Sequence, residues 1–215
     1  MDDKVLRQDI IEELDFEPSL DSAGIGVAVD DGVVTLTGHV PTYAEKVTAL
    51  ETVETVKGVR AIADEIEVRP LGVHMQADDE IAKRVANTLR WTTSVPHERI
   101  RITVKDGRVT LEGEVEQRWQ AEAAVAAIRR LGGLIGINDH VKVRPSVKAD
   151  DVADQIRKAF HRDAELDAAS IRVEVQGGTV TLEGKVRFLG ERRSAERAAW
   201  AAPGVARVVD HLVVA

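Results

Sequence analysis

The chain has 215 residues, a net charge of −8 and no cysteine, which excludes disulfides and thiolate metal sites. Hydrophobic residues make up 44% of the chain and aromatic residues only 3%, so any core must be built from aliphatic side chains. The acidic balance argues against non-specific nucleic-acid binding, which needs concentrated positive charge, and no apolar run approaches the roughly 18 residues of a membrane span.

The charge is unevenly shared along the sequence. Residues 1–70 carry 6 basic and 16 acidic side chains (−10), residues 71–148 carry 13 and 10 (+3), and residues 149–215 carry 10 and 11 (−1). This asymmetry would let the acidic first third dock on a later one, although ordinary solvated charge is the simpler interpretation. No basic and apolar leader precedes the first helical pattern, so we expect a cytoplasmic protein. A periplasmic location is the alternative if a leader has been trimmed.

Each third of the sequence begins with a helix, because apolar residues spaced by four fall on one helical face. These residues are Leu6, Ile10 and Leu14, then Ile81, Val85 and Leu89, then Val152, Ile156 and Phe160. An alternating strand follows in each third, at residues 25–29, 100–104 and 171–175.

A seven-residue strand pattern comes next, and its three copies organise the whole sequence. The copies are residues 34–40, 109–115 and 180–186, each apolar at every second position with a glycine in one of those places. Each follows a dipeptide that tolerates the positive φ angles of a two-residue hairpin, namely Asp31-Gly32, Asp106-Gly107 and Gly177-Gly178. The repeats align without gaps over residues 6–68, 81–143 and 152–214, which predicts three domains at 1–70, 77–145 and 148–215.

A second helix and a last strand complete each repeat. The helix should end near a glycine that adopts the left-handed conformation, Gly58, Gly133 or Gly204. Because this helix joins two strands, we expect a right-handed crossover to a parallel neighbour. The predicted fold is α/β (α+β): three tandem α-β-β-α-β modules, each a three-stranded mixed sheet with two helices on one face. The joining segments 71–78 and 146–149 are short, which favours a compact or stacked arrangement.

The sequence resembles the BON domain, named for bacterial osmotically inducible and nodulation proteins. The resemblance rests on the hairpin with V-x-L-x-G-x-V, the glycine 20 residues later and the ending V-x-D-x-L/I/V-x-V, in three copies that cover nearly the whole chain. It implies α/β modules of the topology above, a role in osmotic and envelope stress, attachment to phospholipid membranes, and chaperone-like protein contacts. It implies no enzymatic mechanism.

The repeated glycines and aspartates are interpreted as structural. A side chain at Gly38, Gly113 or Gly184 would push a helix off the sheet, and close approach of a ligand is the alternative. Asp64, Asp139 and Asp210 alternate in step with the aliphatic residues of the last strand, so they are expected on the same, buried side of the sheet. A buried carboxylate without partners is costly. We therefore expect each to accept backbone N–H groups near the helix–strand turn. One aspartate per module does not supply the oxygens of a cation site, so no metal is expected.

The sequence holds no catalytic motif of the metalloprotease, serine hydrolase or phosphate-loop type. Of its six histidines, only His140 and His211 occupy equivalent places in the repeats, and the alternation of the last strand places both on the side that faces solvent. We therefore expect a protein that is not an enzyme and that needs no cofactor.

The second helix carries the candidate site, because one of its faces differs among the repeats. In repeat 1 this face holds the apolar stripe Tyr43, Val47 and Leu50, interpreted as an interdomain or dimer contact. In repeat 2 it holds Arg118 and Arg129, and in repeat 3 it holds Leu189, Arg193, Arg197 and Trp200. An outward tryptophan flanked by arginines suits a membrane interface or a protein contact, and packing against a neighbouring module is the alternative.

Two hypotheses of function follow. The first is a non-enzymatic, stress-associated binding protein that attaches peripherally to phospholipid head groups through the repeat-3 face, with Arg118 and Arg129. The second is a protein-interaction or chaperone-like module that uses the apolar stripe of repeat 1. The expected partners are phospholipid head groups or other proteins, including a second copy of the chain, and not nucleic acid.

Overall fold

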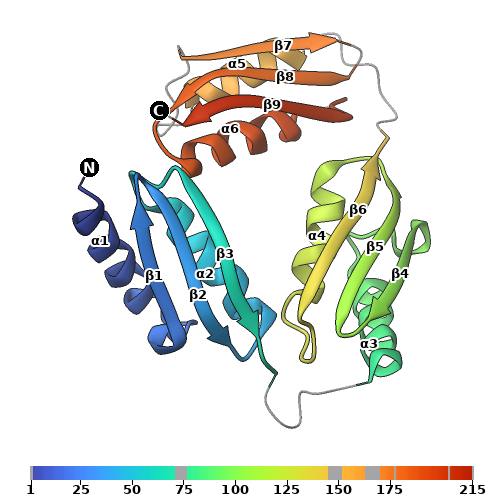
Figure 1. The fold of residues 1–215 in the computed structure, drawn as a ribbon. Coiled ribbons are helices and arrows are strands. Elements are labelled where there is room, and N and C mark those ends of the chain that lie inside the picture. The colour runs from blue at the N-terminus through green and yellow to red at the C-terminus, as the bar shows by residue number, and fades with distance from the viewer. Residues whose placement is uncertain are drawn as a thin grey trace.

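A computed structural model of the chain describes residues 2–70, 77–144, 152–162, 170–176, 178–202 and 204–214. The chain forms three modules of one topology, each with its own three-stranded sheet (Figure 1). The predicted α/β class with three repeated modules is thereby confirmed. Most of the joining segments 71–78 and 146–149 lies outside the described residues.

The modules contain the same elements in the same order. Module 1 consists of α1 (Asp3–Phe16), β1 (Ile25–Asp30), β2 (Val33–Val40), α2 (Tyr43–Thr55) and β3 (Ala61–Val68). Module 2 consists of α3 (Asp78–Trp91), β4 (Ile100–Lys105), β5 (Arg108–Val115), α4 (Arg118–Ile128) and β6 (Gly136–Val143). Module 3 consists of α5 (Val152–Arg162), β7 (Ile171–Gln176), β8 (Thr179–Val186), α6 (Leu189–Ala201) and β9 (Arg207–Val214).

Each sheet is mixed, as expected from a hairpin followed by a crossover helix. The hairpin strands pair antiparallel, with Ile25 opposite Gly38 and Asp30 opposite Val33 in module 1. The second helix then leads to a parallel partner, so that β2, β5 and β8 each lie in the middle of their sheet. A short 3-10 turn, Ser22–Gly24 or His97–Arg99, leads into the first strand of modules 1 and 2.

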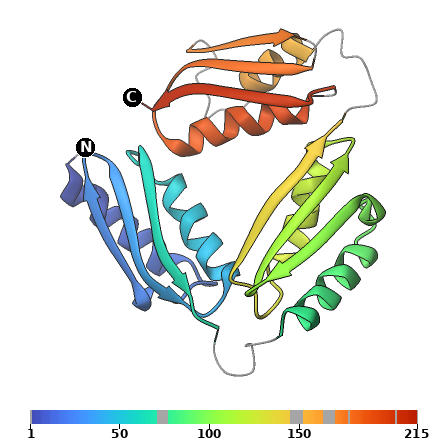
Figure 2. The same ribbon diagram turned by 45° about the vertical axis from the view of Figure 1, so that its right-hand side comes forward.

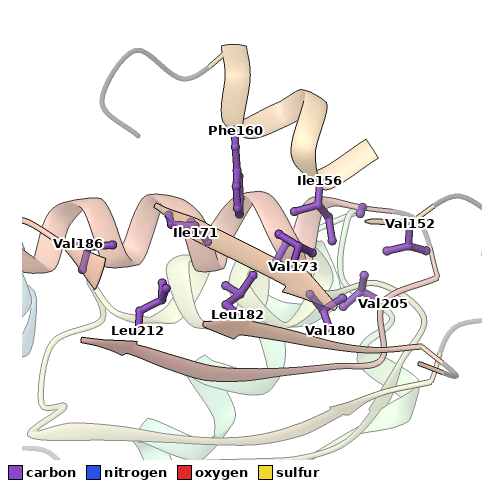
Figure 3. Close-up of a cluster of buried hydrophobic side chains, with 13 residues drawn as sticks. Val152, Ile156, Phe160, Ile171, Val173, Val180, Leu182, Val186, Val205 and Leu212 are labelled. Atoms are coloured by element: carbon purple, nitrogen blue, oxygen red, sulfur yellow. The ribbon is translucent and has the colours of Figure 1, made fainter. Parts of the chain in front are cut away.

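Each module has a separate hydrophobic core between its helices and its sheet. The apolar residues that the sequence analysis placed on the first helix, three per module, are all at most 2% exposed. Figure 3 shows the core of module 3, where Ile156 and Phe160 of α5 point towards strand residues such as Val173 and Leu182. Burying one such side chain stabilises a fold by about 1.5–3 kcal/mol, which is why three anchors spaced by four residues hold the helix to the sheet.

The hairpins of modules 1 and 2 have positive φ at both central residues, as their dipeptides predict. The angles are 47° and 74° at Asp31 and Gly32, and 50° and 73° at Asp106 and Gly107. The sequence analysis did not anticipate that a carboxylate from the first helix holds each turn. Asp3 accepts the N–H groups of both turn residues at 2.8 and 3.1 Å, and Asp78 does the same in module 2 at 2.8 and 2.9 Å.

The strand glycines have a structural reason different from the expected one. Gly38, Gly113 and Gly184 have φ angles of 103°, 148° and 138°. A methyl group on each would lie 2.0 Å from the carbonyl oxygen of the residue before the first strand, which is Gly24, Arg99 or Ser170. The side chain would therefore strike the entering backbone of the first strand, and not a helix as the sequence analysis expected.

The repeated aspartates join the last strand to the second helix. Each accepts the N–H of the residue two positions on, at 3.1, 3.0 and 2.8 Å for Asp64, Asp139 and Asp210. These bonds lie within the strand rather than at the helix–strand turn. Each carboxylate also contacts a cation of the second helix: Lys46 at 2.8 Å, Arg118 at 3.4 Å and Arg192 at 2.6 Å. Lys46 and Arg192 are equivalent in the repeats, whereas module 2 has Ala121 there and uses Arg118 from the preceding turn.

Candidate functional site

The second helices of the three modules converge on the centre of the molecule. Figure 2 shows α6 on the side of module 3 that faces the other modules and α2 on the side of module 1 towards module 2, with α1 and α3 on the outer side. Figure 1 shows α4 on the side of module 2 that faces the centre. Helix α6 contacts both α2 and α4. The face of the second helix that differs among the repeats is therefore where the modules meet.

A solvent-open cleft of about 730 Å³ lies between these helices. Its lining contains four cationic side chains, Lys57, Arg118, Arg193 and Arg197, and four carboxylates, Glu51, Glu54, Glu122 and Glu196. Phe188 and Trp200 add aromatic surface. The cleft thus offers charges of both signs beside an aromatic wall.

Modules 1 and 3 are joined by an ion pair and a backbone bond. Arg193 pairs with Glu54, and the N–H of Leu189 donates to the carbonyl oxygen of Val59 at 3.2 Å. The Leu189 side chain packs against the core of module 1. Burial raises the pKa of Glu54, and the neighbouring Arg193 opposes that rise without cancelling it.

Modules 1 and 2 are joined by a similar combination of charge and apolar packing. Arg129 Nη1 lies 3.3 Å from Glu51 Oε1. Tyr43 of α2 packs against the core of module 2. Burial raises the pKa of its phenol, partly offset by a hydrogen bond with the backbone of Ile137.

Modules 2 and 3 meet at an arginine and a tryptophan. The guanidinium carbon of Arg118 lies 5.6 Å from the ring centre of Trp200, within the range of a cation–π contact. Arg118 also pairs with Glu122 at 3.3 Å, in addition to Asp139. Trp200 itself packs against the core of module 3.

The repeat-3 face expected to point outward is turned towards the other modules. Leu189 and Trp200 are half-buried, and Arg193 is held by Glu54. Arg197 is exposed, and the only hydrogen bond of its side chain within the described part of the chain is donated to Ser194 Oγ, at 3.5 Å. The sequence shows the composition of this face, but the packing of whole modules decides where it points.

The apolar stripe of repeat 1 is also covered in part. Tyr43, Val47 and Leu50 are all half-buried. Tyr43 lies against module 2, as described above, whereas Leu50 packs against the core of its own module. The stripe therefore does not form one continuous exposed surface.

Three exposed aromatic residues were not identified in the sequence analysis. Phe16 and Trp91 end α1 and α3 at equivalent places in the repeats, and they are 86% and 82% exposed. Trp119, at the start of α4, is 53% exposed. The signal was present in the sequence, because the 75-residue offset maps Phe16 onto Trp91 and neither falls on the four-residue spacing of the core face.

The described residues include no cluster of three or more His, Asp or Glu side chains that could hold a metal ion. His140 and His211 are exposed on the sheets, and His211 Nδ1 lies 4.0 Å from Glu183 Oε1. None of the helices that the structure describes has both the length and the apolar character needed to cross a membrane.

Comparison with known proteins places these features in a family. Osmotically-inducible protein Y of Escherichia coli (strain K12) is 26% identical over 148 residues, which are 67% of this chain and 74% of that protein. Two structures of CdsD, a structural protein of the Type III secretion system of Chlamydia trachomatis, one of them of its C-terminal domain, are each 15% identical. The alignments cover 98% of this chain and 92% of the first structure, and 100% of both chains for the second, with TM-scores of 0.28 and 0.27. These scores are too low to inform the fold or the function.

A family model assigns the chain to a known domain family. The sequence profile of the BON domain matches three segments, residues 2–70, 77–145 and 148–215, which together span nearly the whole chain. Each matched segment contains one hairpin, one strand glycine and one terminal aspartate of the kind described above. The chain therefore belongs to the BON domain family, with three BON domains in tandem.

Proposed function

We propose that this protein acts by binding rather than by catalysis, in a stress response, and that it attaches peripherally to phospholipid membranes. Family membership and the similarity to an osmotically-inducible protein support the stress-associated role. The membrane role is supported by the residues that line the central cleft. The head group of a phospholipid is the proposed ligand, and the rim of the cleft on α6 is the proposed contact.

One observation carries this proposal. Arg197 is an exposed cation without an acidic partner in the described ranges of the chain, and it lines the same cleft as Trp200. An arginine guanidinium binds phosphate oxygens in a bidentate manner, and tryptophan is enriched at the level of lipid head groups. The other two arginines of the cleft already form ion pairs, Arg193 with Glu54 and Arg118 with Glu122.

The cleft also limits how strong such binding is. Four carboxylates balance its four cations, so a head group gains no large net attraction there. Near an anionic surface, each basic residue contributes about 1 kcal/mol. Attachment should therefore be reversible and should depend strongly on the charge of Arg197, the one arginine of the cleft lining that has no acidic partner in the described residues.

Flotation of the protein with vesicles of phosphatidylethanolamine and phosphatidylglycerol tests the proposal at one fixed low salt concentration. Arg197→Glu changes the local charge by two, so partitioning should fall about 30-fold, or about 2 kcal/mol. Arg207→Glu is the matched control, because Arg207 is an exposed arginine of the same module that does not line the cleft. A wild-type protein that never floats, or an equal loss with both variants, would contradict the proposal.

A second candidate function is binding of a protein partner or an unfolded client. It is favoured by the exposure of Phe16 and Trp91 at equivalent ends of α1 and α3, because aromatic residues often anchor protein interfaces. Suppression of the aggregation of an unfolded client would test it. Phe16→Ala combined with Trp91→Ala should abolish suppression, whereas Trp119→Ala, which removes an exposed aromatic elsewhere, should not.

A further inference from the structure

The contacts between modules differ in kind from those within them. Each module buries its apolar side chains in its own core, and no core cluster of the described residues is shared equally by two modules. Between modules, single apolar side chains such as Tyr43 and Leu189 rest against a neighbouring core. The closed arrangement therefore depends to a large extent on polar contacts.

The two ionic contacts between module 1 and its neighbours differ in their access to solvent. In the Glu51–Arg129 pair the side chains are 48% and 31% exposed, and in the Glu54–Arg193 pair they are 17% and 53% exposed. Both carboxylates come from α2 of module 1, and the two arginines come from modules 2 and 3. Dissolved ions screen the Glu51–Arg129 pair directly. They reach the Glu54–Arg193 pair only from its arginine side, because Glu54 Oε2 is buried.

The overall charge of the modules adds to this sensitivity. Residues 1–70 carry a net charge of −10, and residues 71–148 carry +3, as counted from the sequence. Modules 1 and 2 therefore attract each other beyond their direct contacts. The Debye length falls from about 30 Å at about 10 mM salt to about 3 Å at about 1 M, so this attraction is lost at high ionic strength.

We propose that the three modules form a clasp that opens when ionic strength rises, with module 1 separating from modules 2 and 3. In the closed state Glu51 and Glu54 hold Arg129 and Arg193. Screening of both pairs leaves the packing of Tyr43 and Leu189 and their hydrogen bonds with the backbone of Ile137 and Val59, which are too few to keep the modules together. The open state exposes the inner faces of α2, α4 and α6. The clasp does not depend on lipid binding.

Energy transfer between two labels on the full chain measures the opening. The sequence has no cysteine, so Lys4→Cys with Lys105→Cys reports on modules 1 and 2, and Lys4→Cys with Lys185→Cys reports on modules 1 and 3. All three lysines are exposed. Transfer should be lost between about 10 mM and about 1 M KCl, over which the Debye length shrinks about tenfold. Sucrose at matched osmolality should leave transfer unchanged.

Charge variants separate the clasp from a general effect of salt. Glu51→Gln with Glu54→Gln should give low transfer already at low salt, with little further change on adding KCl. Glu67→Gln is the matched control, since it removes one acid from module 1 within a local pair with Arg69 at 2.7 Å. It should open with salt as the wild type does. Exchange of charges, with Glu54→Arg and Arg193→Glu, should restore high transfer at low salt relative to Glu54→Arg alone.

Three results would overturn the proposal. The first is transfer that does not change with KCl. The second is a double glutamine variant that stays closed and still opens with salt at the wild-type midpoint. The third is equal opening by sucrose, which would show a response to water activity rather than to ions.

Discussion

Replacement of Gly38 by alanine gives the sharpest test of how the modules are built. At Gly38 the φ angle is 103°, and an added methyl group would lie 2.0 Å from the carbonyl oxygen of Gly24. Carbon–oxygen contacts are ordinarily about 3.3–3.6 Å long, so the start of β1 would have to move by more than about 1 Å. This movement strains the pairing of Ile25 with Gly38.

The expected cost follows from these two effects. A backbone conformation that only glycine readily adopts costs another residue about 1–3 kcal/mol. A lost or strained strand hydrogen bond adds about 1 kcal/mol. We expect Gly38→Ala to destabilise module 1 by about 3 kcal/mol, which is roughly a hundredfold in its unfolding equilibrium. A module of this size has about 3–10 kcal/mol of stability, so the loss should be easily measured.

Hydrogen exchange followed by mass spectrometry is the suitable assay, because it reports each module separately and does not assume two-state unfolding. Protection of β1 and β2 should fall about a hundredfold in Gly38→Ala, with modules 2 and 3 as internal references. Gly26→Ala is the matched control in the paired strand. Its φ is not positive, and its methyl would meet only the rotatable hydroxyl of Thr37, at 2.6 Å. Wild-type protection in Gly38→Ala, or equal losses in both variants, would refute the reasoning.

Two further predictions concern carboxylates. Asp78→Ala removes both carboxylate acceptors from the module 2 hairpin and should lower the free energy of unfolding in urea by about 1–2 kcal/mol. Asp79→Ala, on the solvent side of the same helix turn, is the control and should leave stability near wild type. Equal losses in the two variants would contradict the role of Asp78. Burial raises the pKa of Glu54 above its ordinary value of 4.5, so its folded state holds the proton more tightly than the unfolded state. The contribution of Glu54 to stability should therefore be highest below pH 4.5 and should fall as pH rises through the raised pKa, and Glu54→Gln should remove this contribution from the pH series. A difference curve between wild type and Glu54→Gln that is flat, or that slopes the other way, would contradict the prediction.

The sequence predicts the interior of each module well, because the relevant signals are local and occur three times. Spacing of four residues identifies the buried anchors of the first helices, and the Asp-Gly dipeptides identify the hairpin turns. The reason for the strand glycines was predicted wrongly, since the close approach comes from the backbone that enters β1. That approach depends on strand register and turn geometry, and the alternation of residues along a strand predicts neither.

The candidate site was harder to predict, because it depends on how whole modules pack. Helical spacing correctly groups Leu189, Arg193, Arg197 and Trp200 on one face of α6, but it does not tell whether that face meets solvent or another module. The cation partners of the aspartates were missed for a related reason. Aligning the repeats places Ala121 of module 2 where modules 1 and 3 have a cation, so the alignment predicts no partner for Asp139. The structure supplies the cation from Arg118, in the preceding helical turn.

The separate cores of the three modules have a mechanical consequence. If the chain were stretched from its ends, the weak contacts between modules would yield first, at low force. Each module would then resist on its own, and the load would be released in successive steps of similar length, because the repeats contain nearly the same number of residues. Damage to one module under tension would leave the other two folded and able to bear load.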